Sequence, residues 1–134
     1  MKVTIFTSNQ RRHISLINRL AEISDEVFCV QECNTVFPGK LEDWVGKSEV
    51  MQTYFGHVMA AENRIFGELD FLAPNVRSLS IKSGDLNLLS QGALSVALGS
   101  DVYVVFGASY IKEWLIDFLI ENVALNIHMG ISPY

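Results

Sequence analysis

The sequence predicts an α/β domain with a doubly wound, mostly parallel sheet of five strands, a Rossmann-like arrangement. Short apolar runs alternate with stretches in which apolar residues recur every three or four positions, which gives the order βαβαβαβαβ. In the strand predicted at residues 101–106, Asp101 is followed by a continuous run of branched and aromatic residues, which is typical of a strand covered on both faces. The composition agrees, because 49% of the residues are hydrophobic and only 19% are charged. A chain of 134 residues is expected to form one domain.

The first predicted unit is a strand, a helix and a second strand. Residues 3–6 are the first strand and residues 25–31 the second. The helix between them is predicted to begin near Asn9 or Gln10, with Ser8 or Asn9 as its N-cap. Its free N–H groups would then point at the ligand edge of the sheet and favour an anion there. The turn lacks the G-x-G-x-x-G pattern, which argues against a nicotinamide or flavin enzyme.

The middle of the chain is predicted to contain a loop, a helix and a third strand. Residues 32–47 are aperiodic and are expected to form a surface loop. Residues 48–65 have the period of a helix, whose apolar stripe is expected to pack on the core. A turn at residues 71–75 precedes a strand at residues 76–81. The stripe consists of Met51, Tyr54, Phe55, Val58, Met59 and Ala61.

The last part of the chain is predicted to complete the sheet. Residues 85–98 are expected to form a helix capped by Ser83 or Asp85 and interrupted weakly at Gly92. The remaining predicted elements are strand 101–106, helix 110–122 and strand 123–127. In the usual order 3-2-1-4-5, the fifth strand lies at the margin of the sheet.

The net charge of the chain indicates which classes of partner it can bind. A net charge of −5 and a pI of about 5.1 argue against nucleic acid, because phosphate-backbone affinity depends on clustered Lys and Arg. Arg11 and Arg12 are a local exception. Together with Ser8 and Asn9, they are predicted to bind the phosphate of a small-molecule substrate at the helix N-terminus. In the alternative interpretation, both arginines are solvated residues of the first helical turn.

The sequence contains no recognisable membrane-spanning segment, signal peptide or metal-binding motif. No stretch reaches the roughly 18 uninterrupted apolar residues of a spanning helix, and the N-terminus lacks the features of a signal peptide. A cytoplasmic protein that does not bind membranes is therefore expected. Cys29 and Cys33 have no companion His or Cys, so they are interpreted as reduced thiols and no metal is predicted.

A polar motif ends the fifth predicted strand. Residues 126–133 read N-I-H-M-G-I-S-P, which places Asn126 and His128 at a carboxyl strand end, where open α/β sheets bind ligands. Side chains two positions apart in an extended segment lie on one face, so both can reach one reacting carbon. By spacing alone, the pair also fits an Asn that caps the strand and a His satisfied within a turn.

The motif resembles the N-x-H-x-S-L-L-P signature of the folate-dependent formyltransferases, a family that includes glycinamide ribonucleotide, methionyl-tRNA and amino-sugar N-formyltransferases. Asn126, His128 and Pro133 stand where the family has them. Gly130 replaces the Ser, and Ser132 replaces the second Leu. The order of predicted elements also matches the first half of the formyltransferase domain.

The resemblance implies an enzyme of one-carbon metabolism that transfers a formyl group from 10-formyltetrahydrofolate to an amino group. The Asn126 amide would donate to the formyl oxygen, and His128 would donate to the same oxygen or accept the amine proton. The segment whose backbone lines the pterin pocket in the family is matched by Ser109, Tyr110, Ile111 and Lys112.

The family also uses an Asp, later in its chain, that orients the His, and no residue of this sequence matches it. Residues 1–134 are therefore expected to be a single formyltransferase-like domain, truncated on its C-terminal side and inactive alone. Self-association through the edge of the fifth strand, as a homodimer, is also expected.

Three functions follow as hypotheses. The first is formyl transfer, with an amino-sugar nucleotide as the expected acceptor, since the acidic composition argues against tRNA and the departures at Gly130 and Ser132 argue against glycinamide ribonucleotide. The second is hydrolysis of formyltetrahydrofolate or of a formamide, with water in place of the amine. The third is a nonenzymatic nucleotide-binding domain of the same fold. A product assay separates the first two, and folate binding separates both from the third.

Overall fold

The computed structural model describes residues 1–33 and 48–128, and it confirms an α/β fold with a five-stranded, all-parallel sheet. The strand order β3-β2-β1-β4-β5 is the expected one. The strands are β1 (Lys2–Ser8), β2 (Glu26–Cys33), β3 (Val76–Lys82), β4 (Val102–Phe106) and β5 (Leu125–Ile127). The helical elements are α1 (Arg11–Glu22), α3 (Glu49–Phe66), α4 (Gln91–Leu94), α5 (Glu113–Glu121) and the 3-10 turns η1 (Leu86–Leu88) and η2 (Ala97–Gly99).

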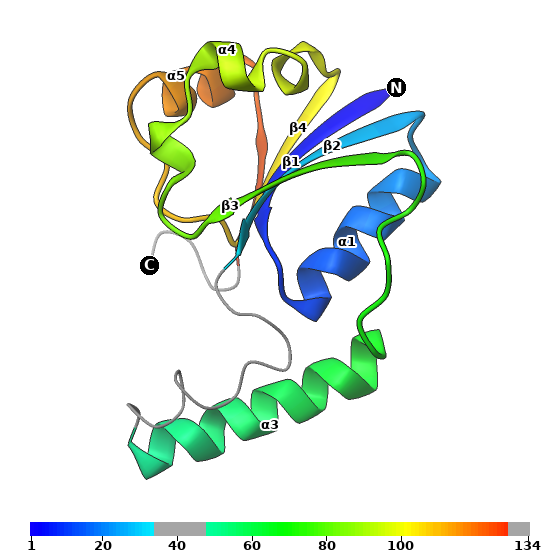
Figure 1. Cartoon of the computed structure of the whole chain (residues 1–134), viewed down its shortest axis with the longest axis vertical. Coiled ribbons are helices and arrows are strands. Elements are labelled where there is room, and N and C mark those ends of the chain that lie inside the picture. The colour runs from blue at the N-terminus through cyan, green and yellow to red at the C-terminus, as the bar shows by residue number, and fades with distance from the viewer. Residues whose placement is uncertain (34–47, 129–134) are drawn as a thin grey trace.

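Alternation along the central strands builds a core on each face of the sheet. Because successive side chains point to opposite faces, Ile5 and Phe6 enter different cores. Figure 1 shows α1 against one face and α4 and α5 against the other. The core under α1 contains Val3, Ile5, Ile17, Ala21, Val27, Cys29 and Val104. The opposite core contains Phe6, Val30, Leu86, Leu94, Tyr103, Leu115 and Leu119.

The parallel register brings the carboxyl ends of four strands to one edge. Ser8 of β1 is level with Glu32 of β2, and Phe106 of β4 is level with Ile127 of β5. Thr7 of β1 is in turn paired with Phe106. Residues that follow these strands therefore meet at the edge where doubly wound sheets bind ligands.

The long helix α3 differs from its prediction. Its apolar stripe was expected to pack on the core, but none of its residues is buried, and the Tyr54 residue is 58% exposed. The helix lies apart from the sheet and reaches α1 near its own C-terminal end (Figure 1), where Arg12 forms an ion pair with Glu62. Helical periodicity predicts that one face is apolar, but it does not predict what that face meets.

The segment predicted as one helix over residues 85–98 instead forms three short turns, η1, α4 and η2. Ser90 interrupts the run because its backbone is extended and its hydroxyl accepts from the N–H of Ala93, which starts a new helix. Each turn contributes one buried apolar side chain, so tertiary burial outweighs the local helical period. These side chains are Leu86, Leu94 and Ala97.

The end of the second strand also differs from its prediction. Glu32 and Cys33, expected in a surface loop, belong to β2, where they pair with Ile81 and Lys82 of β3. The rest of that expected loop, residues 34–47, lies outside the described residues. Pairing with β3 extends the strand beyond its apolar run, because ladder hydrogen bonds are made by the backbone and not by the side chains.

Three other elements, α1, α5 and β5, also begin at residues different from those predicted. Gln10 is the N-cap residue of α1, without a side-chain hydrogen bond, so neither Ser8 nor Asn9 caps this helix; Ser8 ends β1. Helix α5 begins at Glu113 rather than at residue 110, because the preceding residues form a loop fixed by side chains from other elements. Strand β5 begins at Leu125, two residues later than expected.

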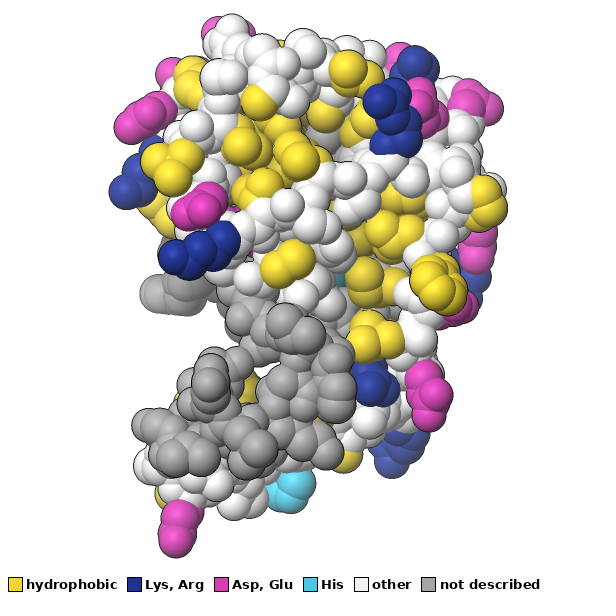
Figure 2. All heavy atoms as spheres, in the orientation of Figure 1, with side chains coloured by type: hydrophobic (Ala, Val, Ile, Leu, Met, Phe, Trp, Pro, Cys, Tyr) yellow, Lys and Arg dark blue, Asp and Glu magenta, His cyan; other side chains and the backbone are white. Residues whose placement is uncertain are grey.

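The surface carries both apolar and charged side chains. On the face shown in Figure 2, apolar groups are exposed across the upper part, while acidic and basic groups are interspersed mainly around the rim. This face has no broad basic patch among its described residues. Within residues 1–33 and 48–128, no helix has the length and apolar character needed to cross a membrane.

Candidate functional site

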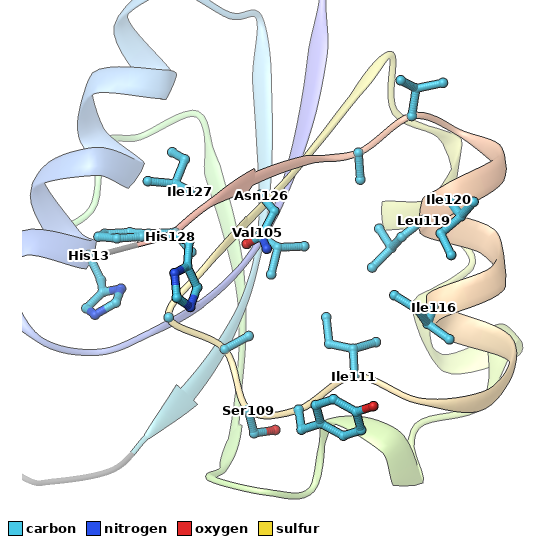
Figure 3. Close-up of a pocket in the computed structure, with 16 residues that line it drawn as sticks. His13, Val105, Ser109, Ile111, Ile116, Leu119, Ile120, Asn126, Ile127 and His128 are labelled. Carbon is cyan, nitrogen blue, oxygen red and sulfur yellow. The ribbon is translucent and has the colours of Figure 1, made fainter. Parts of the chain in front are cut away.

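A cavity of about 760 Å³ opens at the carboxyl edge of the sheet, where β4 and β5 meet α5 and the loop after β4. A concave, largely apolar site with a few convergent polar groups is typical of small-molecule binding, and this edge is where such folds place it. Its apolar wall includes Val105, Ile111, Ile116, Leu119, Ile120 and Ala124 (Figure 3). Its polar residues are His13, Ser109, Tyr110, Asn126 and His128.

Asn126 and His128 are brought to this one cavity by β5. Figure 3 shows their side chains on the same side of the strand, with Ile127 on the other, as the alternation of an extended segment requires. Both residues are exposed, so a ligand in the cavity can reach them. The remaining residues of the motif, 129–133, lie outside the described part of the chain.

The loop between β4 and α5 forms the opposite wall. Ser109, Tyr110 and Ile111 line the same cavity as Asn126. Lys112 lies outside its described wall. It is the N-cap residue of α5, and its ammonium lies 5.7 Å from the ring centroid of Tyr110.

Glu32 holds this loop in place from the end of β2. Its carboxylate is buried, with 1% of the residue exposed. One carboxylate oxygen accepts from the N–H of Ser109 at 2.5 Å. The other accepts from the Ser109 hydroxyl and from the N–H of Gly84, both at 2.8 Å. Three donors from two loops therefore satisfy one buried carboxylate, and the loop conformation is fixed before any ligand binds.

Asn87 of η1 fixes the loop at a second point. Its amide nitrogen donates to the carbonyl of Tyr110, and its amide oxygen accepts from the N–H of Lys112, both at 2.8 Å. Glu32 and Asn87 together hold residues 109–112 from two other elements, which explains why this segment is a defined loop rather than the first turn of α5.

His13 is another polar residue that lines the cavity. It lies in the first turn of α1 and is buried, with 1% of the residue exposed. Its Nδ1 is 2.7 Å from the hydroxyl oxygen of Thr7, which is itself 2.7 Å from the carbonyl oxygen of Phe106. Burial, and then the neighbouring positive charge of Arg12, lower the pKa of His13 from 6.5 to about 4, so the imidazole is neutral at pH 7.

Hydrogen-bond chemistry assigns the tautomer of this imidazole. A carbonyl oxygen only accepts, so the single proton of the Thr7 hydroxyl goes to Phe106. The hydroxyl oxygen must then accept from Nδ1–H of His13. The proton of the neutral ring is thus on Nδ1, and Nε2 carries a lone pair. Nε2 is buried and has no hydrogen-bond partner among the described residues.

The predicted phosphate-binding residues lie apart from this cavity. Arg12 pairs with Glu62 of α3, and Arg11 donates to the carbonyl oxygen of Gly67 at 2.9 Å. Arg11 also lines a second cavity, of about 300 Å³, between α1 and residues 66–70. The structure therefore gives both arginines contacts with the end of α3, and phosphate binding by them stays a prediction.

Ser8 and Asn9 precede α1 at the same strand edge. Ser8 is buried at the end of β1, and its carbonyl oxygen accepts from the side chain of Gln31 at 3.3 Å. Asn9 is half-buried in the turn that follows. Neither residue lines the cavity within the described part of the chain, and their role in substrate binding also stays a prediction.

The two cysteines are free thiols. Burial raises the pKa of Cys29 to about 12, so this thiol stays protonated at neutral pH. Cys33 is half-buried at the end of β2. Among the described residues, no three His, Cys, Asp or Glu side chains are grouped as metal ligands.

Sequence reasoning missed His13, Glu32 and Asn87. A usable signal existed for two of them. Glu32 is a carboxylate directly after an apolar strand, and His13 stands in the first turn of the helix that follows a strand, so both belong to the ligand edge of the sheet. Asn87 carried no such signal, because its role depends on η1 lying beside a loop that is more than 20 residues later in the chain.

Comparisons of this chain with protein-family models, with curated proteins and with solved structures return no match. A functional hypothesis for this chain therefore rests on the geometry of the cavity and on its sequence.

Proposed function

We propose that this chain carries the donor and acceptor sites of a cytoplasmic, folate-dependent N-formyltransferase. The observation that carries the proposal is that Asn126 and His128 share one cavity with Ser109, Tyr110 and Ile111. Asn126 and His128 belong to the motif that carries the resemblance, and Ser109, Tyr110 and Ile111 belong to the segment that the resemblance assigns to the pterin pocket. Their convergence on one site is what a formyl-transfer reaction needs.

The cavity fits a folate-type formyl donor, 10-formyltetrahydrofolate. A flat bicyclic ring needs apolar walls, which α5 and Ile111 supply, and the loop at residues 109–111 forms the facing wall. Glu32 holds that loop in place through its hydrogen bonds with Ser109. When bound, the donor supplies an electrophilic formyl carbon; the residues described below bind and orient it and move a proton.

Asn126 and His128 have complementary roles in the proposed reaction. The amide N–H of Asn126 donates to the formyl oxygen as negative charge develops there, and this stabilises the charge without solvent reorganisation. His128 exchanges a proton with the attacking amine or donates to the same oxygen. Both side chains lie on one side of β5, so they approach a ligand from the same direction (Figure 3).

The proposed acceptor is the amino group of a small molecule, and an amino-sugar nucleotide is the class we expect. The negative net charge of the chain and the interspersed charges on the face in Figure 2 favour a small acceptor over a nucleic acid. The phosphates of a nucleotide would lie toward the N-terminal end of α1, where the backbone N–H groups and the helix dipole favour an anion.

Formyl transfer is tested with the gene product expressed from its full reading frame. The protein is incubated with 10-formyltetrahydrofolate and a panel of amino-sugar nucleotides, and formylated product and free formate are both measured. Formylated product supports the proposal. Formate release at the same rate with and without the amines would instead indicate the hydrolase, and failure to bind 5-formyltetrahydrofolate would indicate a domain without this chemistry.

Variants of the same protein assign the chemistry to residues. Asn126→Ala is expected to lower turnover by about 10²- to 10³-fold, the usual cost of one oxyanion donor. His128→Ala should also remove most of the turnover, and both proteins should stay folded because both positions are exposed. Leu125→Ala is the matched control, since Leu125 lies on the same strand outside the described wall of the cavity. Turnover within a few-fold of the parent in either variant removes that residue from the mechanism.

A further inference from the structure

The Nε2 atom of His13 is a buried hydrogen-bond acceptor at the cavity, and no donor among the described residues binds it. Its Nδ1–H is used by Thr7, and its Nε2 lone pair has no partner among the described residues. Buried polar atoms are nearly always paired, and an exception needs a cause such as a ligand. His13 also lines the cavity that contains Asn126 and His128.

The position of His13 places this acceptor at the reacting end of the cavity. Phe106 and Ile127 are the last paired residues of β4 and β5, and Gly107 and His128 directly follow them at the carboxyl edge of the sheet. The imidazole of His13 packs directly against Gly107, since a Cβ at residue 107 would lie 2.3 Å from its Cε1. His13 and His128 therefore approach the same end of the site from α1 and from β5.

The imidazole is also held in one orientation. Thr7 fixes Nδ1, and the ring of His13 stacks at 4.6 Å from the ring of Phe106, measured between centroids. Gly107 leaves no room for the ring to move toward the loop. An acceptor held rigidly in this way selects a ligand that offers a donor at one place, because little rotamer entropy is lost on binding.

We propose that Nε2 of His13 accepts a hydrogen bond from the amino group of the acceptor substrate and so positions that amine beside Asn126 and His128. This inference rests on the proposed function and adds a third residue to its site. An acceptor-only atom at this place accounts for selection of amines, because the N–H of an amine is a donor that a carbonyl or ether oxygen cannot replace. The same bond directs the nitrogen lone pair away from His13.

The tautomer is tested first, without any ligand. Nitrogen-15 NMR of the protein labelled at histidine distinguishes the Nδ1–H tautomer, the Nε2–H tautomer and the imidazolium, and His13→Asn assigns the signals. A neutral ring with the proton on Nδ1 at pH 7 is expected. A proton on Nε2 would overturn the proposal, because Nε2 would then be a donor.

Binding of the amine is tested next, on the same labelled protein. Glucosamine, which carries an amine, is titrated against 2-deoxyglucose, which carries no hydrogen-bond donor at the same carbon. Glucosamine is expected to shift the Nε2 signal of His13 toward a hydrogen-bonded value, and 2-deoxyglucose to shift it less. No change with glucosamine, or an equal change with both sugars, overturns the proposal.

Two substitutions of His13 distinguish the roles of Nδ1 and Nε2. His13→Asn keeps a side-chain N–H near the position of Nδ1 for Thr7 and removes the atom at Nε2. His13→Gln keeps an amide oxygen near the position of Nε2. We expect His13→Asn to weaken glucosamine binding about tenfold, the value of one hydrogen bond, and His13→Gln to restore part of it. Equal binding in the wild-type and Asn proteins overturns the proposal.

A third measurement separates this inference from the proposed function. Binding of 5-formyltetrahydrofolate should change less than twofold in His13→Asn, because the proposed bond goes to the amine. A large loss of folate binding would assign Nε2 to the donor instead and overturn the proposal. If the amine binds through His13 but no formyl group is transferred, the inference stands and the proposed function fails. If His13→Asn transfers formyl groups as fast as the wild type, the proposed function stands and the inference fails.

Discussion

The Cα of Gly107 lies against the imidazole of His13, so that a methyl group on it would come within 2.3 Å of Cε1 and 3.2 Å of Nε2. Gly107 also has a φ of +65°, a conformation that L-residues avoid. Two independent constraints, backbone conformation and close approach, therefore require glycine at the point where β4 turns into the loop of the candidate site.

Gly107→Ala is predicted to destabilise the protein and to displace His13. The positive φ alone costs roughly 1–2 kcal/mol for a residue with a Cβ, and the contact with the ring adds to it. Gly84→Ala is the control, because Gly84 also has a positive φ, +90°, but no atom within 4 Å of the added Cβ. Urea unfolding should show a larger loss for Gly107→Ala, and only this variant should change the NMR signals of His13. Equal losses and unchanged signals would contradict the contact.

Removing the carboxylate of Glu32 is predicted to loosen the loop that carries Ser109. Glu32→Gln leaves one amide oxygen and turns an NH₂ group toward the donors of Ser109 and Gly84. An unsatisfied buried donor costs about 1–3 kcal/mol, so the free energy of unfolding should fall by at least that much. Affinity for 5-formyltetrahydrofolate should fall as well, as calorimetry can measure.

Ser109→Ala serves as the partial control for Glu32. It removes the hydroxyl contact and keeps the backbone N–H bond to the carboxylate, so its effects on stability and on folate affinity should be smaller. If folate affinity were unchanged in Glu32→Gln while stability fell, Glu32 would support the fold without shaping the site.

The neutral state of His13 predicts a loss of stability in acid. In the unfolded chain this imidazole takes up a proton near pH 6.5, whereas burial delays protonation in the folded protein to about pH 4. Between these values the unfolded state binds more protons, so the free energy of unfolding falls as the pH falls, by about 3 kcal/mol in total.

Unfolding of His13→Asn from pH 7 to pH 4 isolates this contribution. The variant should lose less stability over this range than the wild type, because its residue 13 does not titrate while all other groups are unchanged. His57→Asn is the control, since His57 is exposed on α3, and it should follow the wild-type curve. Parallel curves for the wild-type and His13→Asn proteins would show that His13 titrates alike in both states.

Strand β5 is predicted to mediate self-association of the 134-residue chain. It is the outermost strand beside β4 in the described part of the chain, and it exposes Leu125 and Ile127 at 58% and 43%. It contains no proline or charge that would discourage pairing with another edge. An antiparallel two-fold dimer satisfies the same edge on both copies.

Light scattering at micromolar concentration tests this dimer. Leu125→Lys should convert it to a monomer. Ile23→Lys should not, because Ile23 is an exposed apolar residue at the C-cap of α1, away from β5. A monomeric wild-type chain would show that the β5 edge is not a pairing surface in solution.

The sequence by itself determined the sheet and one side of the site. Apolar runs specify the strands, and the usual order of a doubly wound sheet then predicted the observed order β3-β2-β1-β4-β5. The two-residue period of a strand placed Asn126 and His128 on one side of β5. Both inferences depend on residues close together in the chain, where periodicity carries the information.

Only the tertiary structure decided how the other residues meet this strand. The helical period of α3 predicted an apolar face but not the separation of this helix from the sheet. Residues 85–98 also have a helical period, but they form three short turns that each bury one side chain. Glu32 reaches Ser109 across 77 positions, and Gly107 meets His13 across the β1–β4 junction. Such contacts depend on packing between distant segments, which local propensity and periodicity do not encode.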